Sequence, residues 1–161
     1  MKSQHICLVL VTTLFVACQH SPQFSVSGTL DGAVGEVLYL EHTALTHTTL
    51  MDSCVLDENG DFSLQAPSPQ YPDFYRLRVG SHSLPLAVDS IEEIVVSTSL
   101  DSLPYTLSIN GSKTSLTIAQ LRATARTATR EQLREQAKQT IVQNPRSLAA
   151  YYAVFLKQGG E

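Results

Sequence analysis

The chain is poor in cysteine. Its 161 residues contain only Cys7, Cys18 and Cys54, and no Cys-x-x-Cys pair occurs. Because Cys7 lies in an N-terminal leader and Cys18 at its end, Cys54 has no partner in the rest of the chain. The sequence therefore excludes an internal disulfide and an intramolecular dithiol reaction. We expect Cys54 to pack in a strand as a small apolar side chain.

Positive charge is also scarce. The chain has 11 Lys and Arg against 15 Asp and Glu, a net charge of −4, and its basic residues do not cluster. A nucleic-acid surface needs a basic patch, so we expect no nucleic-acid partner. The hydrophobic content of 43% is ordinary for a globular protein, and the length suits one domain with appendages.

The usual catalytic and cofactor motifs are missing. There is no Gly-x-Ser-x-Gly nucleophile turn, and Gly28, Gly32 and Gly35 lack the spacing of a phosphate-binding loop. We expect no cofactor and no enzymatic activity. A hydrolase whose site is assembled from distant residues is the catalytic alternative.

Two stretches carry metal-type ligands without the spacing of a metal site. His42 and His47 share a stretch that we expect to be a solvated loop, and no third ligand is spaced for a metal. The segment from residue 57 begins like a calcium loop, but its sixth position is Phe62 and its twelfth is Ser68. Gly and a bidentate Glu belong at those positions, so we expect no metal.

Residues 1–17 have the pattern of a signal peptide. Lys2 supplies a positive start, and the apolar stretch over residues 6–16 is too short to span a bilayer. It ends in Leu14-Phe-Val-Ala-Cys18, which resembles the lipobox of bacterial lipoproteins, with Phe15 where Leu is usual. The alternative is an ordinary secretory signal with a chance cysteine.

A lipobox implies cleavage before Cys18 and attachment of lipid to it. Several acyl chains anchor a protein stably, so the chain should be bound to the membrane permanently. Residues 18–23 then form a short tether, and Gln19 after the cysteine points to the outer membrane by resemblance to lipoprotein sorting.

Residues 24–112 predict an antiparallel β-sandwich. About eight short strands are separated by turn residues, as in sandwiches and barrels. They are expected at residues 24–30, 37–40, 51–57, 61–65, 75–79, 84–88, 94–98 and 105–109. The apolar run 37–40 indicates a central strand, and Pro85 places its strand at an edge or a bulge. Tyr75, Leu77 and Val79 alternate with arginines, so they should face inward. The third and fourth strands should form a hairpin, because Asn59-Gly60 is typical of a two-residue turn with two positive φ angles.

Residues 113–161 predict two or three helices. Thr129 with Gln132 fits a capping box that starts one helix, and Asn144-Pro145 predicts both the end of that helix and the start of the last one. The last helix should end near Lys157, with Gly159 as its cap.

The last helix contains eight consecutive apolar residues, 149–156. Such a helix is apolar on every side and should be buried. The sandwich and one amphipathic helix cover only part of it, so we expect an exposed apolar patch. The chain should then self-associate or bind a partner through Tyr151, Tyr152, Phe155 and Leu156. The alternative is a helix that tucks completely into the molecule and leaves a monomer.

An ordered set of motifs runs through the chain. It comprises Phe24-x-Val-x-Gly28, Gly35-Glu-Val-Leu-Tyr-Leu40, Met51-Asp-Ser53, Gly60-Asp-Phe62, Phe74-Tyr75, Asn110-Gly-Ser112 and Asn144-Pro-Arg-Ser147. The set resembles the β-domain of unknown function, with its helical segment, at the N-terminus of lipid-anchored thioredoxin-like thiol–disulfide oxidoreductases of the bacterial envelope. The resemblance covers about residues 24–156. It implies that a thioredoxin domain with Cys-x-x-Cys comes next, and the sequence ends at Glu161 without it, so no activity carries over.

The sequence thus predicts a lipid-anchored accessory or binding module of the bacterial envelope, with a thioredoxin-like partner. The alternative is a stand-alone periplasmic or surface lipoprotein that binds a peptide, a glycan or a protein.

Overall fold

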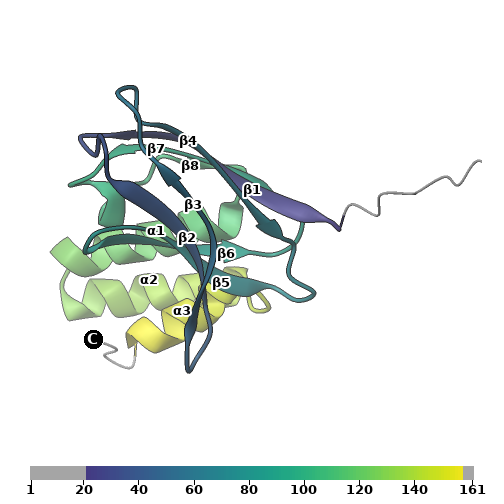
Figure 1. Ribbon diagram of the computed structural model, residues 1–161. Helices are drawn as coiled ribbons and strands as arrows, with labels where there is room; N and C mark the ends of the chain where they lie inside the picture. Colours follow the sequence, from purple (N-terminus) through teal and green to yellow (C-terminus); the bar gives the residue numbers. More distant parts are fainter. Residues whose placement is uncertain (1–20, 158–161) are drawn as a thin grey trace, which may run out of the picture.

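Two four-stranded sheets face each other, and three helices follow them (Figure 1). The computed structural model describes residues 21–157; the expectations for the signal peptide, Cys18, Gln19 and Gly159 lie outside it. One sheet has the order β4-β1-β7-β8 and the other β3-β2-β5-β6. The strands are β1 (Gln23–Asp31), β2 (Val37–Thr43), β3 (Thr48–Val55), β4 (Asp61–Pro67), β5 (Asp73–Val79), β6 (His82–Val88), β7 (Glu93–Ser99) and β8 (Ile109–Asn110).

This arrangement confirms the predicted fold class, a mainly β sandwich followed by helices. The sheets are not wholly antiparallel, because β1 and β7 pair in parallel. β2 is a central strand, as its apolar run predicted, and β6 with Pro85 is an edge strand. Tyr75, Leu77 and Val79 of β5 point into the core, as predicted from their alternation.

The core lies between the two sheets. Alternate side chains of each strand face inward, which is the period that a pleated strand imposes. Leu40 and Leu77 are paired across β2 and β5, and both are fully buried. From the other sheet, Val26, Leu64 and Ile94 complete the same cluster. Each buried aliphatic side chain stabilises the fold by roughly 1.5–3 kcal/mol.

The predicted hairpin is wrong. β3 pairs with β2 and β4 pairs with β1, so the two strands belong to different sheets. The chain crosses between the sheets through Leu56, which is buried in the core and bonded to the loop after β1. Gly60 has a positive φ of 70° but Asn59 does not. A Cβ on Gly60 would lie 2.5 Å from the Leu30 carbonyl oxygen, so close approach to β1 also requires glycine here.

Two other predicted boundaries differ. The expected strand 105–109 is replaced by the short 3-10 helix η1 (Leu103–Tyr105) and the two-residue β8. Pro104 near the start of η1 has a fixed φ that suits a helical turn. The solvated loop expected around His42 and His47 is a tight turn over residues 44–47, because β2 extends to Thr43 and β3 begins at Thr48.

Three α-helices follow: α1 (Lys113–Thr127), α2 (Arg130–Gln143) and α3 (Leu148–Lys157). The predicted capping box at Thr129 and Gln132 is confirmed. The predicted end of the second helix at Asn144 is confirmed, because Asn144 is the C-cap of α2. The predicted start of the last helix at the same residue is wrong, since α3 begins at Leu148. Ser147 caps α3, because its hydroxyl oxygen accepts a hydrogen bond from the Ala150 amide at 3.2 Å.

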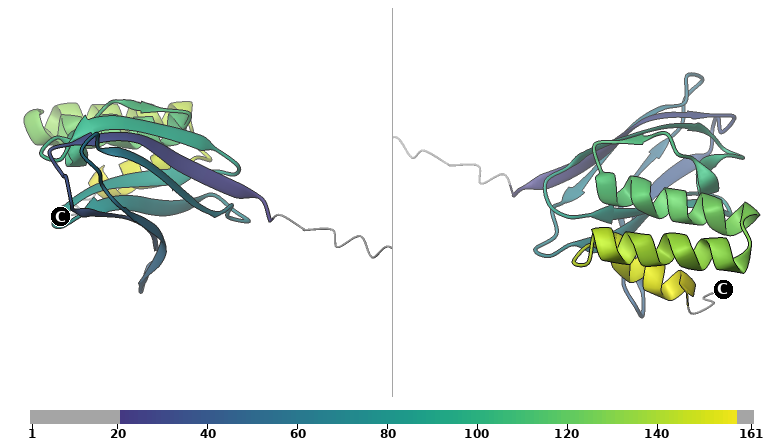
Figure 2. Two further views of the ribbon diagram at one scale, coloured as in Figure 1. Left: turned by 45° about the horizontal axis from the view of Figure 1, so that its top comes forward. Right: turned by 180° about the vertical axis from the view of Figure 1, so that it is seen from behind.

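The helices form a layer beside the sheets, seen from behind in Figure 2. α1 packs on β6, and Ile118 of α1, Ala87 of β6 and Ala149 of α3 form one buried cluster. In residues 21–157, no helix combines the length and the apolar character that a membrane crossing requires.

Candidate binding site between the first and third helices

α3 is buried on one side and exposed on the other. Its alanines, 149, 150 and 153, are buried. Ala153 packs with Leu121 of α1 and Ala137 of α2, and the small side chains let the helices come close together. On the other side, Tyr151, Val154 and Phe155 are 60%, 40% and 50% exposed. α3 therefore leaves the exposed apolar patch that the sequence predicts, and the alternative, a helix that tucks completely into the molecule, is wrong.

The four residues predicted as an interaction surface lie in two environments. Tyr151 and Phe155 are exposed, whereas Tyr152 and Leu156 are half-buried and pack toward the interior. Tyr151 and Tyr152 both contact the ring of Phe74 on β5, with centroids 6.0 and 6.5 Å away. Contact with a partner stays a prediction for this surface.

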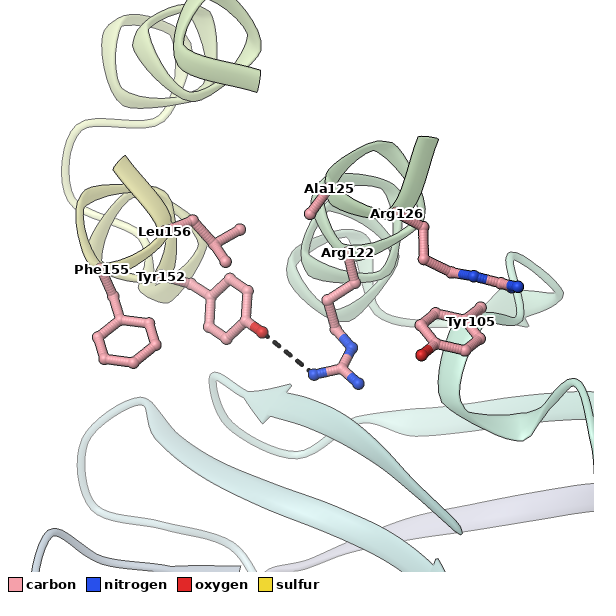
Figure 3. Close-up of a pocket in the computed structure, with 7 residues that line it drawn as sticks. All are labelled: Tyr105, Arg122, Ala125, Arg126, Tyr152, Phe155 and Leu156. Carbon is pink, nitrogen blue, oxygen red and sulfur yellow. Dashed lines mark hydrogen bonds between the residues drawn. The ribbon is translucent and has the colours of Figure 1, made fainter. Parts of the chain in front are cut away.

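A pocket of about 300 Å³ lies between α1, α3 and η1. Figure 3 shows its residues: Tyr105, Arg122, Ala125, Arg126, Tyr152, Phe155 and Leu156. The two arginines, Arg122 and Arg126, come from α1 and lie four positions apart on the same face of that helix. Three of the lining residues belong to the predicted interaction surface, so α3 connects that surface to the pocket.

Arg122 is held in place from two sides. Its Nε donates to the Pro104 carbonyl and its Nη1 donates to the Tyr152 hydroxyl, both at 3.3 Å. The second bond joins α1 to α3 across the pocket (Figure 3). The guanidinium of Arg126 lies over the ring of Tyr105, 4.3 Å from its centroid, which is a cation–π arrangement.

The pocket is positive and partly aromatic. No Asp or Glu lines it. Within residues 21–157, neither Arg122 nor Arg126 forms an ion pair with a carboxylate. The lining also contains no Ser, Cys or His, so its chemistry suits recognition of an anion better than nucleophilic or general-base catalysis.

Sequence reasoning missed four residues of this pocket. Tyr105 was assigned to a strand, and no role was given to Arg122, Ala125 or Arg126. The spacing of the two arginines, in a helix without Asp or Glu, was a usable signal. The position of the two arginines opposite α3 could not be predicted from the sequence, because it depends on how the helices pack.

Two other clusters of polar residues join β2 to β5. Glu41 on β2 accepts hydrogen bonds from Arg76 and Arg78 of β5. These hydrogen bonds lower the pKa of the Glu41 carboxyl, and the bond from Arg78 has the largest effect. His42 lies in β2 rather than in the predicted loop, and its Nε2 is 2.7 Å from a carboxylate oxygen of Asp73.

The described residues contain no group of three potential metal ligands. Cys54 packs against the core from β3, as predicted. Burial, and then the charge of Asp52, raise the pKa of its thiol, so little reactive thiolate is present at neutral pH.

Comparison with known proteins gives a family but no activity. No curated protein matches the sequence. One matching solved structure is a 9R-lipoxygenase from Cyanothece, with 9% identity and a TM-score of 0.33, over 91% of this chain and 27% of the lipoxygenase. So low a TM-score carries no argument about fold or function. A family profile, described as a domain of unknown function (DUF4369), matches residues 24–116, and the chain therefore belongs to the DUF4369 family.

Proposed function

We propose that the protein is a lipid-anchored accessory module of the bacterial envelope that binds a thioredoxin-like thiol–disulfide oxidoreductase. The observation that carries this proposal is the exposed side of α3, where Tyr151, Val154 and Phe155 leave apolar surface in contact with water. Grouped exposed apolar side chains usually mark an interaction site.

The choice of partner rests on the resemblance described above. In the resembling proteins, a redox domain follows the helical segment in the chain and would therefore lie next to α3. The family match over residues 24–116 includes most of the motifs on which the resemblance depends. The lipobox-like sequence ending at Cys18 supports attachment to the membrane.

A second function, a stand-alone binding lipoprotein, is favoured by the pocket. Two arginines and three aromatic rings line a cavity of about 300 Å³, the lower end of the range for small-ligand pockets. The two functions are compatible, because the ligand would occupy the pocket and the partner would contact Tyr151 and Val154, which do not line that pocket. Phe155 belongs to both surfaces.

Membrane fractionation tests the anchor that both functions require. The wild type should sediment with membranes and resist extraction with high salt, because the lipid is buried in the bilayer. Cys18→Ser should move the protein to the soluble fraction. Cys7→Ser is the matched control, since it changes a cysteine within the same leader without touching the attachment site. A Cys18→Ser protein that still sediments in high salt would show that the lipoprotein assignment is wrong.

A further inference from the structure

We propose that the pocket between α1, α3 and η1 binds a 3-arylpropionate group, a carboxylate two carbons away from an aromatic ring. This group occurs in free aryl acids and at the end of a peptide whose last residue is Phe or Tyr. The inference rests on the second proposed function, binding of a ligand in the pocket, and is independent of the partner at α3.

The charge of the pocket selects an anion. A guanidinium has five N–H donors, and Arg122 uses one donor each for Pro104 and Tyr152. The remaining donors of Arg122, and those of Arg126, are available within the described contacts. The protein has a net charge of −4, so the molecule as a whole does not attract anions and the positive charge that would bind one is local to this pocket.

The spacing of the arginines gives a second reason for an anion. Like charges four residues apart on a helix repel each other and destabilise it. The Tyr105 ring holds the guanidinium of Arg126 near the pocket at 4.3 Å from its centroid. A carboxylate placed between Arg122 and Arg126 would relieve the repulsion and accept hydrogen bonds from the planar edge of a guanidinium.

The rest of the lining selects an aromatic body. Tyr152 and Phe155 form a tilted aromatic pair with ring centroids 6.4 Å apart, and Leu156 adds an aliphatic wall. A third ring in this pair would gain edge or offset contacts. A cavity of about 300 Å³ has room for one ring and a short acid chain.

The test is an NMR titration of ¹⁵N-labelled residues 18–161 carrying Cys18→Ser, at fixed ionic strength. The probe is 3-phenylpropionate, and the comparison probes are its amide, 3-phenylpropanamide, and propionate. Peaks of Arg122, Arg126 and Tyr152 should shift with 3-phenylpropionate, and both comparison probes should bind at least about tenfold more weakly, since each lacks one half of the recognised group.

Two substitutions locate the site. Arg126→Gln should weaken binding of 3-phenylpropionate about tenfold, because the exposed Arg126 would no longer supply a charge-assisted hydrogen bond. Arg134→Gln on the exposed surface of α2 is the matched control and should bind like the parent. A titration with the peptide acetyl-Gly-Gly-Phe shows whether the natural ligand is a peptide end or a free aryl acid. Tighter binding of this peptide than of 3-phenylpropionate indicates a peptide end, and weaker binding indicates a free acid.

Three results would overturn the inference: no shift with 3-phenylpropionate, equal affinity for 3-phenylpropanamide, or equal affinities of the Arg126→Gln and Arg134→Gln proteins. None of them would affect the membrane fractionation result for Cys18→Ser, which judges the proposed lipid-anchored module separately.

Discussion

Glu41 lies on β2 with 7% of its surface exposed, between two arginines of the neighbouring strand. One of its oxygens is 2.6 Å from Arg76 Nε and the other is 2.7 Å from Arg78 Nη2. Arg78 also lies over the ring of Tyr39, 4.4 Å from its centroid. A carboxylate that is this enclosed needs both partners, because a buried charge without hydrogen bonds is strongly destabilising.

Replacing Glu41 should make the free energy of unfolding less dependent on pH in the acidic range. Because the folded pKa of Glu41 lies below its ordinary value, the carboxylate stabilises the fold above the unfolded pKa of about 4.3 and stops doing so as pH falls through the folded pKa. Glu41→Gln should lower the free energy of unfolding by about 2 kcal/mol at pH 7. The difference between wild type and variant should shrink below about pH 4.

Urea denaturation at pH 7 and at pH 3 measures this difference. Burial raises the pKa of Glu92, so that carboxyl favours folding as pH falls; it is present in both proteins and cancels in the comparison. Glu58→Gln, at an exposed turn position, is the control and should differ little from wild type at either pH. An undiminished Glu41→Gln effect at pH 3 would contradict a stabilising ion pair.

At the residue scale, burial could be predicted and ion pairing could not. Alternation along β5 placed Tyr75, Leu77 and Val79 in the core, because strand periodicity is a local property. The pairing of Glu41 with Arg76 depends on the register between β2 and β5. Two other strands, β3 and β4, lie between these strands in the sequence. Nothing local in the sequence indicates that register.

At the scale of elements, the start of α1 protects the free edge of β6. The Ser115 hydroxyl accepts a hydrogen bond from the Ala87 amide and donates one to the Ala87 carbonyl, both at 3.0 Å. Ser112, the N-cap of α1, also donates to that carbonyl. The backbone groups of an edge strand need partners or cover, and here two serines of a helix supply them.

Removing the Ser115 hydroxyl should therefore destabilise the whole fold. Ser115→Ala leaves the buried Ala87 amide without its partner, which costs about 2 kcal/mol. Thr117→Ala is the control, because that hydroxyl donates only to the Lys113 carbonyl within α1. Its effect should stay within about 0.5 kcal/mol. Thermal melts compare the two, and equal melting temperatures would show that the serine contact does not hold α1 to the sheet.

Elements defined by local signals were predicted well, and their pairing was not. The capping box at Thr129 is a local arrangement of four residues, and it forms as predicted. Asn59-Gly60 indicated a turn correctly, but the core contact of Leu56 directs β4 to the other sheet. The parallel pairing of β1 with β7 joins segments that are distant in the sequence, so no turn signal reports it.

At the scale of the molecule, the pocket and the exposed side of α3 share one helix. Tyr152 and Phe155 contribute to the pocket, while Tyr151 and Val154 face outward beside it. The apolar run 149–156 allowed the prediction of an interaction surface on α3. The pocket could not be predicted, because it forms only when η1, α1 and α3 come together around Arg122.

The exposed side of α3 can be examined by photo-crosslinking in living cells. A photo-crosslinking amino acid replaces Phe155, which is half exposed, and in a second variant it replaces Val142, which is 78% exposed on α2 and is the control. Both variants keep Cys18, so the protein should remain at its native site. Crosslinked products are then identified by mass spectrometry.

This crosslinking measurement tests the proposed partner most directly. The account predicts that position 155 yields a covalent product with a protein that carries a Cys-x-x-Cys pair, and that position 142 does not. A product at position 155 that contains two copies of this chain, or no product above the level at position 142, would contradict a thioredoxin-like partner at α3.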